Sequence, residues 1–328
     1  MAEKRLVKTY IIHNPASGRF KEEEYGDLLA SLNGRGIEAV GLGTERPRHA
    51  EELARRAVLE PERTQVGKVI VAMGGDGLLG EVLDGLVPLW NKEGGDFVYL
   101  PLACGTANDG ARVAGVPDSR EAQKRIFNYR EGSIEPRELS VFQVEASGEK
   151  RHTFVHAGMG ITGDITEWMH SDTGKAVKRR LGSLAYPLSG LYFFLGGRPR
   201  DVFLEIGEGE SAFKREGKVY SIDAGQIESM GGIKKYFPGA TPFGNNGARV
   251  VVIGDGLAKP LAPVALGIAS FGAHTGFPGI SYLREGTDYS GPIAVSSEKP
   301  FPVDVAGEPI GNAYRLVVRK LQGAARTI

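Results

Sequence analysis

The sequence predicts an N-terminal α/β domain of Rossmann-like type followed by a C-terminal antiparallel β-sandwich domain. Three observations support this prediction. The chain has 328 residues, more than one ordinary domain needs. Strand-like and helix-like segments alternate over about the first 130 residues, and short strand-like segments separated by glycine, proline and charged turns dominate the rest. We place the domains at 1–134 and 135–328, with the option that the C-terminal tail returns to the first domain.

The first domain is predicted to repeat a strand–helix unit. Apolar runs rich in β-branched residues indicate strands at 7–13, 37–42, 69–73 and 97–102. Apolar residues spaced by three and four, as at Tyr25, Leu28, Leu29 and Leu32, indicate helices at 22–32, 50–59, 81–90 and 107–114. Such alternation predicts a parallel sheet that binds ligands at the carboxyl ends of its strands.

The second domain is predicted to be mostly strands, at 139–144, 152–157, 201–206, 218–224, 248–253, 292–295 and 301–305. A helical stretch at 165–194 interrupts them. Its apolar run from Leu184 to Gly197 is shorter than the roughly 20 residues that cross a bilayer. We expect a buried core helix there; an apolar pocket wall or a membrane-touching face is the alternative.

Composition narrows the classes of function. Forty basic residues balance forty acidic ones, and this zero net charge argues against a nucleic-acid-binding protein. The single cysteine, Cys104, excludes an intrachain disulfide and fits a reducing compartment. The N-terminus shows no signal-peptide pattern, so we expect a cytoplasmic protein. The six histidines lack metal-ligand spacing, which argues against a zinc site.

The run Gly74-Gly75-Asp76-Gly77 directly follows the predicted strand at 69–73 and precedes a helix. Glycines let the backbone approach a bulky anion, and a helix N-terminus offers unpaired N–H groups. A carboxylate inside such a cradle fits an anion that arrives with a divalent cation, or a hydroxyl that must lose a proton. This combination predicts phosphoryl transfer from a nucleotide.

Two more glycine turns follow predicted strands, at 14–18 and 105–109. Because parallel strands end at one sheet edge, we expect the three turns to converge there and bind a nucleotide. Asn14, Ser17, Thr106 and Asn108 could bind phosphate or ribose oxygens, and Arg19 could neutralise phosphate charge. An ordinary turn with a helix cap is the alternative for any one of them. The glycines at 75, 77 and 80 also match the short dinucleotide fingerprint, a weak signal because it follows the third strand.

In order and spacing these motifs resemble the diacylglycerol kinase catalytic domain family, in its bacterial soluble lipid kinase branch. Asn14 to Gly18 matches Asn-Pro-x-Ser-Gly, Gly74 to Gly77 matches the start of Gly-Gly-Asp-Gly-Thr, and Gly105 to Asp109 resembles Gly-Thr-x-Asn-Asp. The resemblance implies Mg²⁺-dependent transfer of the γ-phosphoryl group of ATP to a lipid hydroxyl. The nucleotide-binding residues that it implies are Asn14, Pro15, Ser17, Gly18, Arg19, Thr44, Gly74, Gly75, Asp76, Gly77, Leu78, Gly80, Glu81, Gly105, Thr106, Asn108 and Asp109.

The chain departs from the family pattern at two functional positions. Leu78 replaces the threonine of the glycine box, and Ala306 stands where the family has the aspartate of Asp-Gly-Glu-Pro, a proposed general base. Residues two apart share a face of a strand, so Asp304 is expected beside Ala306, with Glu308 on that face if the strand runs straight. The catalytic candidates are therefore Asp76, Glu308 and Asp304.

A structural Mg²⁺ is a separate implication of the resemblance. Bacterial members of the family can hold this ion at a loop similar to Asp255-Gly256-Leu257. The implied ligands are the Asp255 carboxylate and the carbonyl oxygens of Val252 and Leu257. A plain Asp-Gly turn is the alternative.

The resemblance thus implies an ATP-dependent lipid kinase with diacylglycerol as the expected acceptor. One alternative is a catalytically impaired, kinase-like protein that binds nucleotide or lipid, suggested by Ala306 and Leu78. Another is a kinase for a sphingoid base, a ceramide or a non-lipid alcohol. The expected partners are the lipid substrate, a transiently contacted membrane surface and a second copy in a homodimer. Neither nucleic acid nor a transmembrane segment is expected, and the location would be cytoplasmic and peripheral to the membrane.

Overall fold

The computed structural model describes residues 4–17, 20–61, 66–90, 97–104, 108–208, 212–231, 233–269, 271–289 and 291–328. The chain divides into two compact units, Met1–Val141 with Gln322–Ile328, and Phe142–Leu321. The predicted boundary at residue 134 falls shortly before this division, and the C-terminal residues group with the first unit. Strands β5 and β13 contribute residues to both units.

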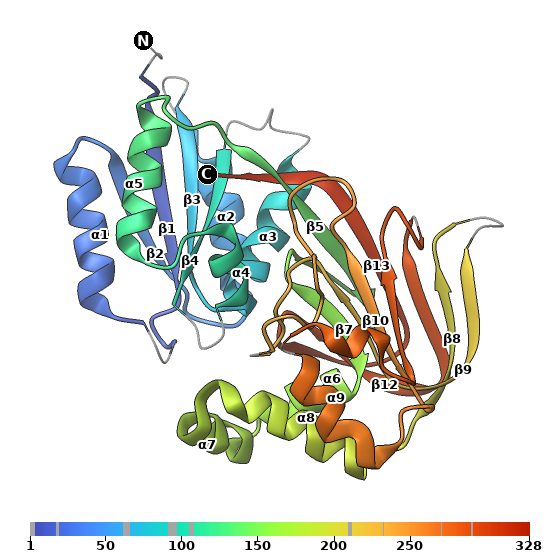
Figure 1. Cartoon of the computed structure of the whole chain (residues 1–328). Helices are drawn as coiled ribbons and strands as arrows, with labels where there is room; N and C mark the ends of the chain where they lie inside the picture. Colours follow the sequence, from blue (N-terminus) through green and yellow to red (C-terminus); the bar gives the residue numbers. More distant parts are fainter. Residues whose placement is uncertain are drawn as a thin grey trace. The chain divides into compact units, whose positions relative to one another are not determined.

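The first unit alternates strand and helix, as predicted (Figure 1). Its elements are β1 (Val7–His13), α1 (Glu22–Gly34), β2 (Glu38–Gly43), α2 (His49–Leu59), β3 (Gly67–Gly74), α3 (Asp76–Trp90), β4 (Phe97–Ala103), α4 (Asp109–Ala114), α5 (Ser119–Arg130) and the start of β5 (Arg137–Ala146).

Helix α5 is not among the predicted helices, although its sequence carries a start signal. The Asp118 carboxylate accepts the N–H of Glu121 at 2.9 Å and so caps the helix N-terminus. An aspartate followed three residues later by a glutamate is a form of the capping-box pattern.

The sheet of the first unit is parallel in the order β2-β1-β3-β4, and the end of β13 joins it parallel to β4 at Thr327. Side chains alternate across a strand, so the nearly continuous burial of β1, β3 and β4 means that these strands bury residues on both sheet faces. On one face, Ile11, Val71 and Leu100 pack with Leu28 of α1 and Ile126 of α5 in a single cluster. The sheet is therefore covered by helices, which leaves its ends as the places for a ligand.

The second unit contains the rest of β5 and then mostly strands, with two helical insertions. Its elements are β6 (Glu149–Thr153), β7 (His156–Gly160), α6 (Ile161–His170), α7 (Asp172–Leu181), the 3₁₀ turn η1 (Gly182–Leu184), α8 (Ala185–Gly196), β8 (Arg200–Ile206), β9 (Phe213–Gly225), β10 (Arg249–Gly254), η3 (Lys259–Leu261), α9 (Ala262–Ala269), η4 (Ala273–Gly276), β11 (Ile280–Arg284), β12 (Ile293–Val305) and β13 (Glu308–Thr327).

Strand pairs in the second unit are antiparallel, from β11 through β10, β9, β7 and β12 to β13. Strand β8 pairs with both β9 and β12. These pairs connect the described strands into one hydrogen-bonded network. The mixed α/β fold is confirmed, whereas a two-sheet sandwich stays a prediction.

Several predicted boundaries in the second unit are wrong. The single strand expected at 152–157 is two strands, β6 and β7, and the two strands expected at 292–295 and 301–305 are one strand, β12. Strands β11 and β13 and helix α9 are not among the predicted elements. Gly158 and Gly160 lie in β7, and Gly163 lies in the first turn of α6.

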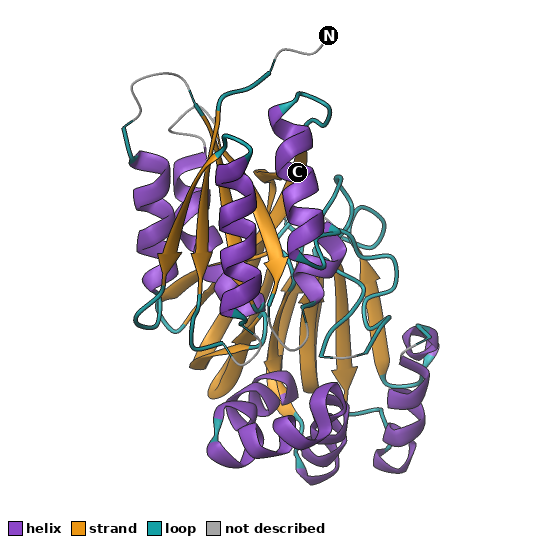
Figure 2. Ribbon diagram, turned by 90° about the vertical axis from the view of Figure 1, so that its left-hand side faces the viewer, coloured by secondary structure: helices purple, strands orange, loops and turns teal. Residues whose placement is uncertain are grey.

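The prediction of a buried core helix at 184–197 is also wrong. Helix α8 buries only Ala185, Ser189 and Phe194 among its described side chains, while the large side chains of Leu188 and Tyr192 are exposed. Figure 2 shows the helices α6 to α9 gathered at one end of the strands. None of the helices among the described residues is long and apolar enough to cross a membrane.

Candidate functional site

The carboxyl ends of the four parallel strands are linked by hydrogen bonds in the first unit. The Thr44 N–H, after β2, donates to the His13 carbonyl oxygen at the end of β1 at 2.9 Å. The Cys104 N–H, after β4, donates to the Gly74 carbonyl at the end of β3 at 2.9 Å. The Ser17 hydroxyl then joins the first and last turns by donating to the Cys104 carbonyl at 3.0 Å. The described parts of the three glycine turns therefore lie together, as the strand order requires.

Asp76 connects two of these turns through its carboxylate. It begins α3, and its Oδ1 and Oδ2 accept the backbone N–H groups of Gly110 at 3.0 Å and Asp109 at 3.3 Å. Asn108 precedes α4 with a left-handed φ of 55° and makes no side-chain cap. Asp76 therefore supplies from another helix the acceptor that the N-terminus of α4 lacks.

The other predicted residues of this edge take up several positions. The Asn14 side chain accepts the Ala16 N–H at 2.9 Å and so shapes a turn that exposes Pro15. Gly75 precedes α3, and Gly77, Gly80 and Glu81 lie within it. Gly18, Arg19, Gly105 and Thr106 lie outside the described residues.

Gly74 is explained by packing within its own turn. A Cβ at Gly74 would overlap the side chain of Leu78, the residue that replaces the family's threonine. The bulkier leucine therefore depends on a glycine four residues earlier, and the two positions are coupled. At this residue, close packing accounts for the glycine without any ligand.

His13 lies beneath the first turn and was not a predicted site residue. Its ring packs on Phe20 and Tyr25, with centroid separations of 5.0 Å and 4.2 Å. Burial lowers the pKa of His13, which favours a neutral ring at neutral pH. The only sequence signal was the position of His13 at the end of a strand, next to Asn14. The packing of His13, Phe20 and Tyr25 therefore supports the turn at 14–18 and adds no charge to the candidate nucleotide site.

The carboxyl ends of the parallel strands could bind a magnesium ion only together with phosphate oxygens, which would supply the remaining metal ligands. Asp76, Asn14, Ser17 and Thr44 offer hard oxygen atoms, and Mg²⁺ commonly takes one or two carboxylates together with substrate phosphates. The residues that the structure describes hold no group of three or more His, Cys, Asp or Glu suited to a metal. The edge therefore fits Mg²⁺ delivered with a nucleotide and offers no preformed metal cage.

The loop at Asp255 fits the plain-turn alternative. The Leu257 N–H donates to the Gly254 carbonyl at 3.3 Å and closes a turn with Asp255 and Gly256 at its centre. Val252 lies inside β10, paired with Ile222 on one side and Ser281 on the other. A strand interior engages its backbone groups in the sheet, so this donor set does not fit a metal ion.

The expected shared face of Asp304, Ala306 and Glu308 is wrong because the chain reverses between them. Strand β12 ends at Val305 and β13 begins at Glu308, so Ala306 and Gly307 form a two-residue hairpin turn. Both have left-handed φ angles, 53° for Ala306 and 82° for Gly307. The two-residue periodicity of a strand does not apply across such a turn.

The two remaining carboxylates near this turn differ in exposure. Asp304 is 1% exposed, and its Oδ2 accepts the Gly307 N–H at 2.9 Å and lies 3.2 Å from His156 Nε2. Glu308 is exposed and lies 3.3 Å from His170 Nε2, a contact that raises the pKa of His170. Asp304 is thus built into the turn, while Glu308 is open to solvent.

Asp304 and Asp223 face one small space over β7. Gly158 pairs with Asp304 of β12 on one side and Asp223 of β9 on the other. Asp223 Oδ1 and Asp304 Oδ1 both lie within 3.2 Å of the point that a Cβ at Gly158 would occupy. The Asp304 Oδ1 atom is buried and has no hydrogen-bond partner among the residues that the structure describes. A side chain at residue 158 would therefore clash with the Asp223 carboxylate and the Thr162 hydroxyl, and it would crowd the Asp304 carboxylate.

Asp223 is fully buried and is held by hydroxyl groups. It accepts from Thr162 at 2.7 Å, from Ser221 at 2.8 Å and from Tyr236 at 2.8 Å. Burial is the main cause that raises the pKa of Asp223 to about 6, with Asp304 adding to the rise. Asp223 was not a predicted site residue, and its sequence surroundings carry no motif that marks it.

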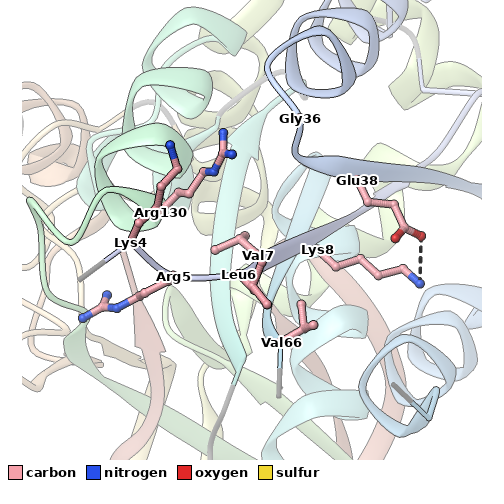
Figure 3. Close-up of a pocket in the computed structure, with 9 residues that line it drawn as sticks. All are labelled: Lys4, Arg5, Leu6, Val7, Lys8, Gly36, Glu38, Val66 and Arg130. Atoms are coloured by element: carbon pink, nitrogen blue, oxygen red, sulfur yellow. Dashed lines mark ion pairs between the residues drawn. The ribbon is translucent and has the colours of Figure 1, made fainter. Parts of the chain in front are cut away.

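A basic hollow of about 360 Å³ lies near the start of β1, at the opposite end of the strand from the glycine turns (Figure 3). Three of its four cations form ion pairs, and the fourth, Arg130, donates to the Arg35 carbonyl oxygen at 2.6 Å. Lys8 pairs with Glu38 at 3.0 Å and with Glu60, Arg5 pairs with Glu135, and Lys4 pairs with Glu131. Most of the positive charge around the hollow is therefore neutralised by carboxylates. The carboxyl ends of the parallel strands, which we call the carboxyl edge, remain the candidate site.

Comparison with known proteins identifies the family. Residues 8–140 match the family model for the diacylglycerol kinase catalytic domain. The diacylglycerol kinase of Bacillus subtilis (strain 168) is 30% identical over 237 residues, covering 71% of this chain and 69% of that protein. The chain belongs to the diacylglycerol kinase catalytic domain family. The predicted family, and the prediction of an enzyme of the lipid kinase type, are confirmed.

Further relatives extend the similarity over most of the chain. The diacylglycerol kinase of Staphylococcus saprophyticus is 27% identical over 300 residues, covering 91% of this chain and 88% of that protein. A crystal structure of a diacylglycerol kinase from Bacillus anthracis str. Sterne covers all of this chain and 98% of its own, with a TM-score of 0.72 and 18% identity. This structural likeness supports the fold, and the sequence relatives support the family.

Proposed function

We propose that this protein transfers the γ-phosphoryl group of ATP to the hydroxyl of diacylglycerol, a reaction of phospholipid biosynthesis. The observation that carries the proposal is the carboxyl edge, where Asp76 joins two strand–helix turns through hydrogen bonds of 3.0 Å and 3.3 Å. The acceptor is suggested by relatives named diacylglycerol kinase.

In the proposed site, ATP lies on the glycine turns with its phosphates near the N-terminus of α3. That helix spans Asp76–Trp90, long enough to present a positive dipole end. Asn14, Ser17 and Thr44 would offer polar groups to the nucleotide, and the hydrogen bond from Ser17 to the Cys104 carbonyl supports this by joining two of the turns. Asp76 would hold Mg²⁺ together with phosphate oxygens, and the ion would neutralise charge on the transferred group.

We assign acceptance of the proton from the lipid hydroxyl to Glu308. Its carboxylate is exposed and is oriented by His170 at 3.3 Å, whereas Asp304 is buried and serves the adjoining turn. A positioned carboxylate base contributes roughly 10² to 10⁴ in rate. Replacing Glu308 with Gln should therefore lower turnover about a hundredfold or more while ATP binding is kept.

The test is phosphate transfer from ATP with Mg²⁺ to diacylglycerol, a sphingoid base and ceramide in mixed micelles. Transfer to diacylglycerol that disappears in Asp76→Asn supports the proposal. Transfer only to another acceptor would replace the substrate and keep the kinase chemistry. Tight ATP binding without transfer to any acceptor would contradict the proposal and favour the impaired kinase.

One observation favours that second function, a nucleotide- or lipid-binding protein with weak catalysis. Ala306 stands in the hairpin turn where the resemblance places a catalytic aspartate, and it carries no group that can accept a proton. Supplying a carboxylate at this residue separates the two functions, because only an impaired enzyme would gain a large amount of activity from it.

A further inference from the structure

Large apolar side chains are exposed on helices α8 and α9 and on the turns beside them. We call this group the apolar patch; it comprises Leu184, Leu188, Tyr192, Leu195, Val264 and Phe271. Tyr192 is 73% exposed and Phe271 is 80% exposed. Exposed apolar groups of this extent usually mark a surface that meets a partner or a membrane.

The patch follows helix geometry and does not come from scattered residues. Leu184, Leu188, Tyr192 and Leu195 recur at intervals of four, four and three, so they share one face. The opposite side of α8 packs inward through Phe194, which joins a cluster with Ala262 and Ala265 of α9. The helix therefore has an anchored face and an exposed face that are both apolar.

The turn η3, which leads directly into α9, is hydrogen-bonded to the end of α8. Lys259 Nζ donates to the carbonyl oxygens of Leu195 at 2.7 Å and Gly197 at 3.0 Å, at the C-terminal end of α8. Helices α8 and α9 contact each other, and Figure 1 shows both at the same end of the unit. The patch is thus a preformed surface on a helix pair.

The segment just before α8 is strongly basic. Between residues 171 and 199 the only acidic residue is Asp172, whereas the basic residues are Lys175, Lys178, Arg179, Arg180 and Arg198, in a chain with no net charge. Lys175, Arg179 and Arg180 are exposed, and within the described residues none of them pairs with a carboxylate. An apolar face beside unneutralised cations complements a surface that is both apolar and anionic.

We propose that α7, α8 and α9 form the surface by which this protein docks on an anionic lipid bilayer, with the apolar patch inserted at the headgroup level and the α7 cations on lipid phosphates. A homodimer through the same face is less well supported, because a two-fold interface would bring two copies of the basic segment together. This docking surface would bring the enzyme to its acceptor, and it rests on the proposed function in one respect, namely that the acceptor is a membrane lipid.

Vesicle co-sedimentation tests the docking surface without any kinase assay. The folded full chain is mixed with vesicles of phosphatidylcholine, with or without phosphatidylglycerol. Binding should need phosphatidylglycerol and weaken with salt. The double variant Leu188→Gln/Tyr192→Gln should bind at least about tenfold more weakly. The control Tyr314→Gln, an exposed aromatic residue on β13 outside the patch, should bind like the parent protein.

A charge variant makes the test independent of the apolar residues. Arg179→Gln/Arg180→Gln should lose about fivefold in affinity for each charge and only on anionic vesicles. Unchanged binding in the patch variant would overturn the proposal. So would a parent protein that dimerises through the patch and ignores vesicles.

A kinase assay then separates this proposal from the proposed function. The patch variant should phosphorylate a short-chain, monomeric diacylglycerol as well as the parent does, and a long-chain diacylglycerol in vesicles at least about tenfold less well. Equal loss on both acceptors would contradict a docking role. If no acceptor were phosphorylated by the parent, the proposed function would fail while vesicle binding still decided the docking surface.

Discussion

The buried and half-buried aspartates of the two units differ in their exposure and in the groups that bond to them. In the first unit Asp76 is half-buried at the carboxyl ends of the parallel strands, and its carboxylate accepts the backbone N–H groups of Asp109 and Gly110. In the second unit Asp223 and Asp304 are buried, and Asp223 is surrounded by three hydroxyl donors. The first arrangement leaves room for phosphates, whereas the second is closed to solvent.

This difference shows what each carboxylate can do. A group that meets a dissolved nucleotide has to stay accessible, and its charge is favoured by a helix N-terminus. A buried carboxylate such as that of Asp223 has its pKa raised by burial. It needs hydrogen-bond donors from the protein to compensate for the loss of water. Asp76 is therefore suited to chemistry, and Asp223 and Asp304 are suited to organising β7, β9 and β12.

The largest expected effect separates two aspartates that both cap helices in the first unit. Asp76→Asn should lower turnover by roughly a thousandfold, because it removes charge where phosphate and Mg²⁺ are expected to meet. The melting temperature should fall by a few degrees, because the amide oxygen keeps one of the two hydrogen bonds to α4 and the amide nitrogen cannot accept the other. Asp118→Asn, at the cap of α5, is the matched control and should leave turnover unchanged. Equal activity in the two variants would contradict a catalytic role for Asp76.

The next effect is a pH dependence of the free energy of unfolding, which arises from Asp223 in the second unit. The pKa of Asp223 rises from 3.8 to about 6 on folding, so its protonation stabilises the folded state below about pH 4 and this stabilisation is lost as pH rises through 6. Asp223→Asn removes that loss. Its free energy of unfolding relative to the parent should therefore increase by about 2 kcal/mol between pH 4 and pH 7.

Urea unfolding at both pH values measures this difference. Asp201→Asn, on the exposed side of β8, is the control and should show no such trend. A constant difference between Asp223→Asn and the parent across this range would mean that Asp223 does not carry a raised pKa.

Much of the first unit could be predicted because its signals are local. Apolar runs mark the strands, and the parallel order then brings Ser17, Thr44 and Asp76 to one edge without knowledge of side-chain contacts. The contact of Asp76 with α4 could not be predicted, since it joins residues more than thirty positions apart and depends on the left-handed backbone at Asn108.

The second unit was harder to predict because its site depends on strand register. Gly158 lies between Asp223 and Asp304 only after three strands pair, and the sequence separates these residues widely. The apolar run of α8 gave a wrong burial prediction for a related reason. Hydrophobicity alone cannot tell a core helix from one whose apolar face is left exposed.

A smaller effect concerns the hairpin turn formed by Ala306 and Gly307. Ala306 has a left-handed φ of 53°, which Asn and Asp tolerate better than Ala. Ala306→Asn should therefore raise the free energy of unfolding by about 1 kcal/mol. Ala306→Asp should stabilise the turn similarly and also supply a carboxylate. With Glu308 as base, both variants should turn over within a few fold of the parent; a gain of about a hundredfold in Ala306→Asp alone would show that the natural chain lacks its base.

The smallest effect comes from the exposed ion pair of His170 and Glu308, and it contrasts with buried Asp223. Glu308 raises the pKa of His170, so the pair stabilises the fold below about pH 6.5 and the contribution is lost as pH rises through the folded pKa. Both side chains are well exposed, at 42% and 54%, so water and salt screen the pair. His170→Gln should cost a few tenths of a kcal/mol at pH 6 and nothing at pH 8, measured by urea unfolding. A cost above about 1 kcal/mol, or one that persists at pH 8, would mean that His170 supports the Glu308 turn through packing and not through its charge.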